Sequence, residues 1–213
     1  RSAEELLSIA LQHWQLAQGR KPGEVRLRVV PPPDAAAAGS RALARIETVN
    51  DDMPFLVDSI SMAVREAGSS IDWAVHPVLS IRRDAAGQIV EVASAIEGDD
   101  GHNESLIHLQ FEPLATPQAY QVLEENLRRL LGDLRLVVND FAAMRDRANE
   151  IAERLQNVPE GADAAEFAEA REFLRWLESG HFTFLGSAEA DAVPMEEGRA
   201  RFVTRTEASL GLA

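Results

Sequence analysis

Residues 41–68 read RALARIETVNDDMPFLVDSISMAVREAG and carry the clearest fold signal in the chain. Apolar side chains (Ala42, Ala44 and Ile46) occupy alternate positions over 41–49, which predicts a strand with one buried face. From Pro54 to Ala67 the apolar residues recur at helical spacing, and Gly68 follows as a C-cap. The stretch therefore predicts a strand that turns directly into an amphipathic helix.

The next segments predict further strands. Every second residue from Ile71 to Ile81 is apolar, which predicts one long strand in which Pro77 marks an edge position or a bulge. A turn at 84–87 then leads into a returning strand over 89–96, and alternation over 107–111 predicts another strand segment.

Two helices are predicted beyond this point. Thr116-Pro117 is an N-cap and first-turn pair, and it opens a helix that Gly132 ends. A short strand is predicted over Leu134–Val138. Asp140 then caps a longer helix, in which apolar residues repeat at heptad-like spacing as far as Leu155.

The order of elements over 41–138 is therefore strand, helix, strand, strand, helix, strand. Two split βαβ units of this kind predict an α+β, ferredoxin-like βαββαβ sandwich, with two helices on one face of an antiparallel sheet. Three parts are predicted along the chain. They are an N-terminal helix, strand and Pro/Ala-rich linker over 1–40, the βαββαβ domain with its C-terminal helix over 41–158, and the start of a following module over 159–213.

The chain also carries signs of being a piece of a longer polypeptide. It starts at Arg1 without a methionine, and the strand-like run over 201–204 has nothing after it to pair with. A strand predicted over 182–186 follows an acidic helix predicted over 164–179. We therefore expect the last part to continue in chain that lies beyond Ala213.

Composition excludes several function classes. The 21 basic and 35 acidic residues among 213 give a formal net charge of −14, which repels nucleic acid and anionic lipid. The absence of cysteine excludes disulfides, a thiolate nucleophile and Cys-ligated zinc. No apolar run approaches the ~20 residues that span a bilayer, and no signal peptide is visible. The expectation is a cytoplasmic protein with no nucleic-acid or membrane partner.

No catalytic constellation or metal site is predicted. The chain lacks the glycine-rich phosphate-binding and nucleophile-elbow motifs, and adjacent carboxylates such as Asp51-Asp52 point apart. The five histidines do not share the spacing of a metal site. The acidic stretch 97–104 could attract Ca²⁺, but it does not match a calcium loop, and a solvated hairpin tip is favoured. The histidines are His13, His76, His102, His108 and His181.

One turn has a functional interpretation. The strand before Pro54 runs directly into a helix, whose N-terminal N–H groups could bind the carboxylate of a ligand. Asn50 or Asp52 could instead cap the helix or hold a ligand ammonium group, and plain capping is favoured from the residues alone. The candidate effector-binding residues are Asn50, Asp51, Asp52, Met53, Pro54 and Phe55.

The same turn resembles that of the ACT domain, a small-molecule regulatory module. In ACT domains the turn typically reads D-x-P-G-L, and Asp52, Pro54 and Leu56 match it. Phe55 stands where the family usually has glycine, a residue that lets a bound amino acid approach the backbone. A phenyl ring at this position would crowd such a ligand.

Longer stretches resemble the N-terminal region of the large bacterial NAD-specific glutamate dehydrogenases. They are 49–59, 76–78, 104–108, 172–177 and 182–186. The resemblance implies oxidative deamination of glutamate to 2-oxoglutarate with NAD⁺ by the full-length protein. It also implies that the catalytic lysine, the catalytic aspartate and the NAD-binding fingerprint lie beyond Ala213, so that this fragment holds no catalytic residue and binds no cofactor.

Three roles remain open within this resemblance. The chain could be a regulatory or assembly region whose partners are the other domains and subunits of one homo-oligomeric enzyme. It could be an amino-acid sensor at the turn Asn50–Phe55, or a structural scaffold in which Phe55 plugs that site. An unpaired edge strand and the apolar seam of the Asp140–Leu155 helix are the surfaces expected to assemble subunits.

Overall fold

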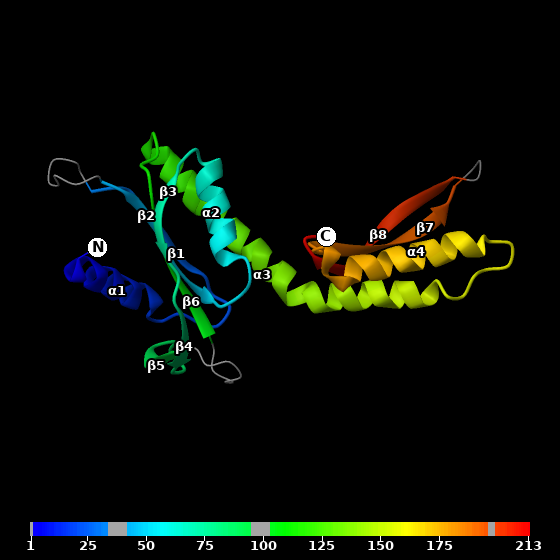
Figure 1. Cartoon of the computed structure of the whole chain (residues 1–213), viewed down its shortest axis with the longest axis horizontal. Helices are drawn as coiled ribbons and strands as arrows, with labels where there is room; N and C mark the ends of the chain where they lie inside the picture. The colour runs from blue at the N-terminus through cyan, green and yellow to red at the C-terminus, as the bar shows by residue number, and fades with distance from the viewer. Residues whose placement is uncertain (1, 34–41, 95–102, 196–198) are drawn as a thin grey trace. The chain divides into compact units, whose positions relative to one another are not determined.

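The computed structural model describes residues 2–33, 42–94, 103–195 and 199–213. Most of the linker predicted before residue 41 and of the acidic loop 97–104, including His102, lies outside these residues. The chain divides into two compact units, 1–132 and 133–213 (Figure 1). The elements in order are α1 (Ala3–Ala17), β1 (Arg26–Val30), β2 (Ala44–Asp51), α2 (Leu56–Glu66), β3 (Ile71–Val75), β4 (Val78–Arg83), β5 (Ile89–Ser94), β6 (Asn103–Phe111), α3 (Pro117–Arg154), α4 (Ala164–Trp176), a π-type turn η2 (Leu177–His181), β7 (Gly186–Pro194) and β8 (Ala200–Gly211).

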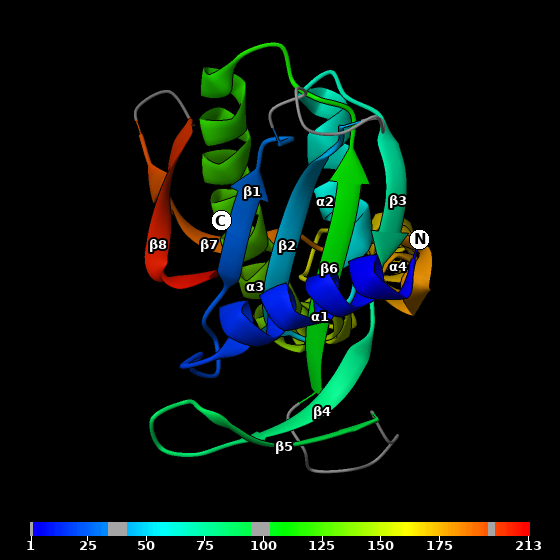
Figure 2. The same cartoon turned by 90° about the vertical axis from the view of Figure 1, so that its left-hand side faces the viewer.

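The first unit is built on one antiparallel sheet. Its strand order is β1-β2-β6-β4-β5, and β3 also pairs with β6. Helices α2 and the first part of α3 cover one face of the sheet, whereas α1 crosses the other face (Figures 1 and 2). This arrangement confirms the predicted α+β, ferredoxin-like sandwich and adds a helix to the face that such a sandwich leaves open.

The core lies between the sheet and the α2/α3 layer. Ile46 of β2 pairs in register with Leu109 of β6, and both side chains are fully buried. Leu127 of α3 and Ile60 of α2 are also fully buried. Each such side chain contributes about 1.5–3 kcal/mol by leaving water. The helical and strand periodicities of the sequence therefore converge on one core.

The strand predicted over Leu134–Val138 is wrong, because α3 continues without interruption through Gly132 and this segment. A glycine inside a helix costs only about 1 kcal/mol relative to alanine, which is too little to end a helix whose Val137 is buried. Asp140 caps no helix, and its carboxylate accepts a hydrogen bond from Gly211 N at 2.8 Å instead.

The edge position beside β2 is filled by β1, from the N-terminal segment. β1 pairs antiparallel with β2, with Arg28 opposite Glu47. The segment predicted to stand apart from the sandwich thus supplies one of its strands, and the compact unit begins at the N-terminus.

Two further strand predictions need correction. The run from Ile71 to Ile81 forms two strands, β3 and β4, which are separated at His76-Pro77 and pair with different halves of β6. The strand predicted over 182–186 begins only at Gly186, as β7.

The run over 201–204 lies in β8 and does have a partner, since β8 pairs antiparallel with β7. No helix in the described part of the chain combines the length and the apolar character needed to cross a membrane.

Candidate functional site

The predicted effector turn ends on an uncapped helix. Phe55 occupies the N-cap position of α2 without a side-chain capping bond, so the prediction that Asn50 or Asp52 caps this helix is wrong. The φ angle of Phe55, +67°, lies in the left-handed region that favours glycine, the residue that ACT domains usually carry at this position. The Phe55 ring is 55% exposed. Phe55 thus keeps the backbone shape of the family's glycine and directs its ring toward solvent.

The two carboxylates of the turn already have partners within the chain. Asp51 pairs with Arg20 and accepts a hydrogen bond from Gly23 N at 2.8 Å. Asp52 accepts a hydrogen bond from the hydroxyl of Ser105 at 2.5 Å. The two carboxylates therefore have different partners.

Asn50 and Ser105 make further polar contacts around the turn. Asn50 is fully buried and its amide donates to Thr48 Oγ1 at 3.0 Å. Ser105 Oγ also lies 2.8 Å from His76 Nε2. The hydroxyl sits between carboxylate and imidazole, so this is not the order of a hydrolase triad, in which the histidine is central.

A second cluster is a buried network of two arginines and two carboxylates. Arg83 makes a bidentate pair with Glu104, with both N–O distances at 2.7 Å. Arg20 lies 3.1 Å from the same carboxylate and also pairs with Asp51. Arg20 and Glu104 are each only 1% exposed. Glu104 was predicted in a solvated loop tip, whereas β6 carries it into the interior.

This arginine–carboxylate network joins distant segments. Arg83 also donates to the carbonyl oxygens of Ala17, at the end of α1, and of Gly87, in the turn before β5, at 2.7 and 2.6 Å. The hydrogen bonds that Arg83 donates are charge-assisted, and such bonds are stronger than neutral ones. The network therefore fastens α1 and the β4–β5 turn to β6.

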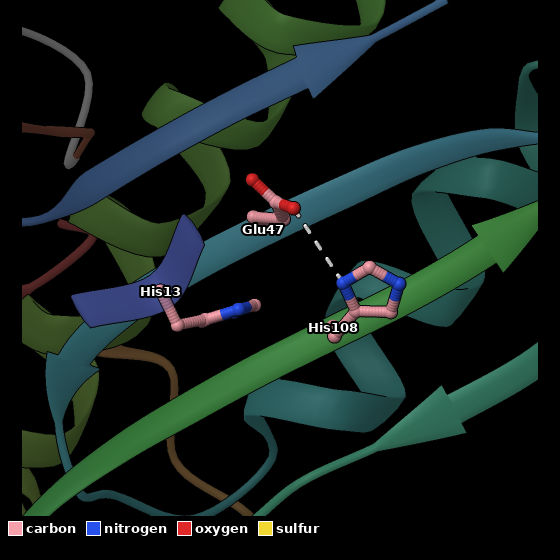
Figure 3. Close-up of side chains that lie close together, drawn as sticks. All are labelled: His13, Glu47 and His108. Atoms are coloured by element: carbon pink, nitrogen blue, oxygen red, sulfur yellow. Dashed lines mark ion pairs between the residues drawn. The ribbon is translucent and has the colours of Figure 1, made fainter. Parts of the chain in front are cut away.

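A third cluster lies on the α1 side of the sheet and consists of His13, Glu47 and His108 (Figure 3). One potential ligand atom from each lies within 4.8 Å of the others, and all three side chains are buried. Glu47 and His108 face each other across β2 and β6, with His108 Nδ1 3.6 Å from Glu47 Oε1. His13 reaches them from α1.

Glu47 is held as a carboxylate. Burial by itself raises the pKa of this group, but the neighbouring His108 and the guanidinium groups of Arg28 and Arg45 outweigh burial and lower the pKa from 4.5 to about 2. Burial lowers the pKa of His13 below its ordinary value of 6.5. The His13 ring nitrogens face the carbonyl oxygens of Ile107 at 3.2 Å and Ile9 at 3.3 Å.

The three residues offer a two-histidine, one-carboxylate ligand set of the kind that zinc uses. However, Glu47 pairs with Arg28 through one oxygen and with Arg45 at 3.2 Å through the other. A divalent cation would have to displace or adjoin these two guanidinium groups, whose positive charge repels it. The geometry therefore fits a buried charge network better than a metal centre.

Comparison with known proteins identifies the family. Residues 1–127 match the family model described as the ACT1 domain of glutamate dehydrogenase. The chain belongs to the glutamate dehydrogenase ACT1 family. The ACT1 match covers the sheet, β1 included, and the beginning of α3 as far as residue 127. It confirms the resemblance that the turn 50–56 shows.

Relatives extend the match beyond the ACT1 domain. The chain is 32% identical to the NAD-specific glutamate dehydrogenase of Pseudomonas aeruginosa and 31% identical to that of Halomonas elongata, in each case over its whole length. It is 25% identical over 82% of its length to the enzyme of the same name from Mycobacterium tuberculosis. The chain spans 13% of the length of the first two relatives.

The clusters escaped prediction because their members are far apart in the sequence. Alternation within β2 and β6 places Glu47 and His108 on one face of their strands, and this signal was available. Nothing in the spacing indicates that His13, from a helix outside the predicted sandwich, would join them. The involvement of Asn50–Phe55 in effector binding stays a prediction.

Proposed function

We propose that this chain is the N-terminal ACT-type regulatory or assembly region of an NAD-specific glutamate dehydrogenase. The observation that carries the proposal is the match of all 213 residues to 13% of relatives that bear this name. The whole enzyme would convert L-glutamate, NAD⁺ and water to 2-oxoglutarate, ammonia and NADH in the cytoplasm. NAD would bind in chain beyond this segment.

The architecture supports a role in assembly. β1 and β5 stand at the two ends of the strand order, and outer strands present backbone groups that another chain can pair with. The predicted seam on α3 is a weaker candidate, because its Met144 and Ala148 are already buried within this chain. We propose the outer strands as contacts with other domains or with a second subunit.

We expect the 213-residue chain alone to form no NADH from glutamate and NAD⁺, because the catalytic groups lie elsewhere in the polypeptide. The absorbance of NADH measures this directly. The complete polypeptide, assayed at the same molar concentration, serves as the control and should be active. NADH formation by the isolated chain, or an inactive complete polypeptide, would refute the proposal.

A second candidate function is sensing of an amino acid at the turn Asn50–Phe55. The observation that favours it is the uncapped N-terminus of α2, whose free N–H groups and partial positive charge suit a carboxylate. The exposed ring of Phe55 is the feature that would stand between this helix end and a ligand.

If the turn is a sensor, replacing Phe55 with glycine should strengthen amino-acid binding, since glycine keeps the left-handed backbone and removes the ring. Calorimetry of the wild-type chain and Phe55→Gly against the common amino acids measures this. A ligand present at a hundred times its Kd would also stabilise the chain by about 2.7 kcal/mol. The absence of heat and of any shift in Tm for both chains would exclude the sensor and leave an assembly role.

A further inference from the structure

An apolar pocket lies between α1 and the face of the sheet opposite α2. Its volume is about 410 Å³, within the range of roughly 300–1,000 Å³ typical of small-molecule sites. None of the described residues that line the pocket is Lys, Arg, Asp or Glu. The main walls are Ile9, Ala10 and Trp14 of α1 and Trp73, Leu79 and Ile81 of the sheet.

The two histidines of the wall have their ring nitrogens turned to other groups. The His13 ring nitrogens face backbone carbonyl oxygens of α1 and β6. His108 Nδ1 faces Glu47, and its Nε2 lies 3.2 Å from the side-chain amide of Gln110. The histidines therefore present mainly ring surface to the pocket. A charged group inside it would lose hydration without gaining a partner.

Two tryptophans and two histidines place aromatic rings in a wall that is otherwise aliphatic. The Trp73 ring meets the His108 ring edge-on, with the ring centroids 5.7 Å apart, and Trp14 lies on the α1 side. Such walls favour an aromatic ligand, which can stack offset or edge-to-face against them. Trp14 is 48% exposed, so a ligand would also remove apolar surface from water.

The size of the pocket favours a small molecule over a helix of another chain. Two turns of α-helix, about 10 Å across and 11 Å long, occupy roughly twice the volume of this pocket. We propose that the pocket binds an uncharged aromatic molecule of one or two fused rings. This site goes beyond the proposed function and is distinct from the turn Asn50–Phe55, no residue of which lines it.

The test uses 2-naphthol as the probe and the Trp176→Phe variant of the 213-residue chain. That variant retains Trp14 and Trp73 as its only tryptophans, and both line the pocket. We expect saturable quenching of their fluorescence and one-to-one binding by calorimetry. 2-Naphthoate has the same rings and an added charge, and we expect it to bind at least about tenfold more weakly.

Two matched variants locate the site. Ala10→Phe fills the pocket from α1 and should weaken 2-naphthol binding at least about tenfold. Ser8→Phe adds the same side chain to α1 at a residue that does not line the pocket, and it should leave binding unchanged. Both positions are exposed, so we expect both variants to fold. Circular dichroism and Tm check this.

Three results would overturn the proposal. They are the absence of saturable binding, equal affinity of Ala10→Phe and Ser8→Phe, and equal affinity for 2-naphthol and 2-naphthoate. Sedimentation equilibrium supplies a fourth. If the chain dimerises and Ala10→Phe alone breaks the dimer, a second copy occupies the pocket instead.

Discussion

Replacing Glu104 with glutamine is expected to lower the free energy of unfolding of the first unit by about 3–5 kcal/mol. The carboxylate is 1% exposed, accepts two hydrogen bonds from the Arg83 guanidinium group and forms an ion pair with that of Arg20. Glutamine keeps the shape but removes the negative charge. Two cations then remain close together, with the partly exposed Asp51 as their remaining carboxylate in the network.

The size of this effect follows from burial more than from the number of ion pairs. Removing one partner of a buried pair leaves an uncompensated charge where water cannot solvate it. The same residues also hold the end of α1 and the β4–β5 turn, through Arg83. Loss of Glu104 should therefore loosen both segments together, including the helix that covers the apolar pocket.

Urea unfolding followed by the fluorescence of Trp14 and Trp73, in the Trp176→Phe background, reports on the first unit. Glu91→Gln is the matched control, because Glu91 pairs with Arg82 on the surface, where the side chains are 60% and 68% exposed. That pair is worth about 0–1 kcal/mol. Equal losses in Glu104→Gln and Glu91→Gln would show that the buried network does not stabilise the fold.

The sandwich could be predicted because its core elements carry unambiguous periods. Residues 41–68 alternate with period two and then recur at helical spacing, and the structure follows both patterns. Leu134, Leu136 and Val138 also occupy alternate positions. Over so few residues, however, the same pattern of apolar positions can occur in a helix as well as in a strand. Only the packing of Val137 and the continuity of α3 decide between the two interpretations.

The identity of the edge strand could not be read from the order of elements. A strand that precedes the first βαβ unit can occupy the same edge as one that follows the second. The contacts that favour β1 are long-range ones, such as the pairing of Arg28 with Glu47. The burial of Glu47 depends on the same pairing, so the edge strand and the charge network were missed for one reason.

The buried carboxylate of Glu47 is expected to make the fold sensitive to acid. The pKa of Glu47 is 4.5 in ordinary surroundings and about 2 in the folded chain. Because the folded pKa is lowered, the carboxylate stabilises the fold fully above about pH 4.5, and this contribution is lost as the pH falls toward 2. A difference of this size corresponds to stabilisation on the order of 3 kcal/mol.

His13 acts in the same direction at higher pH. Burial lowers its pKa below 6.5, so the unfolded chain takes up the proton first and stability begins to fall as the pH drops below about 6.5. Stability therefore begins to fall through His13 at a higher pH than through Glu47, whose contribution is lost between about pH 4.5 and 2.

The Glu47→Gln variant separates the Glu47 contribution from that of the other carboxylates. We expect it to be less stable than the wild-type chain at pH 7 by on the order of 3 kcal/mol, and this difference should shrink as the pH falls from 4.5 to 2. Urea unfolding at several pH values measures it. Glu125→Gln, at an exposed position on α3, is the control and should parallel the wild type throughout. A constant difference between Glu47→Gln and the wild type at every pH would mean that the charge of Glu47 does not stabilise the fold.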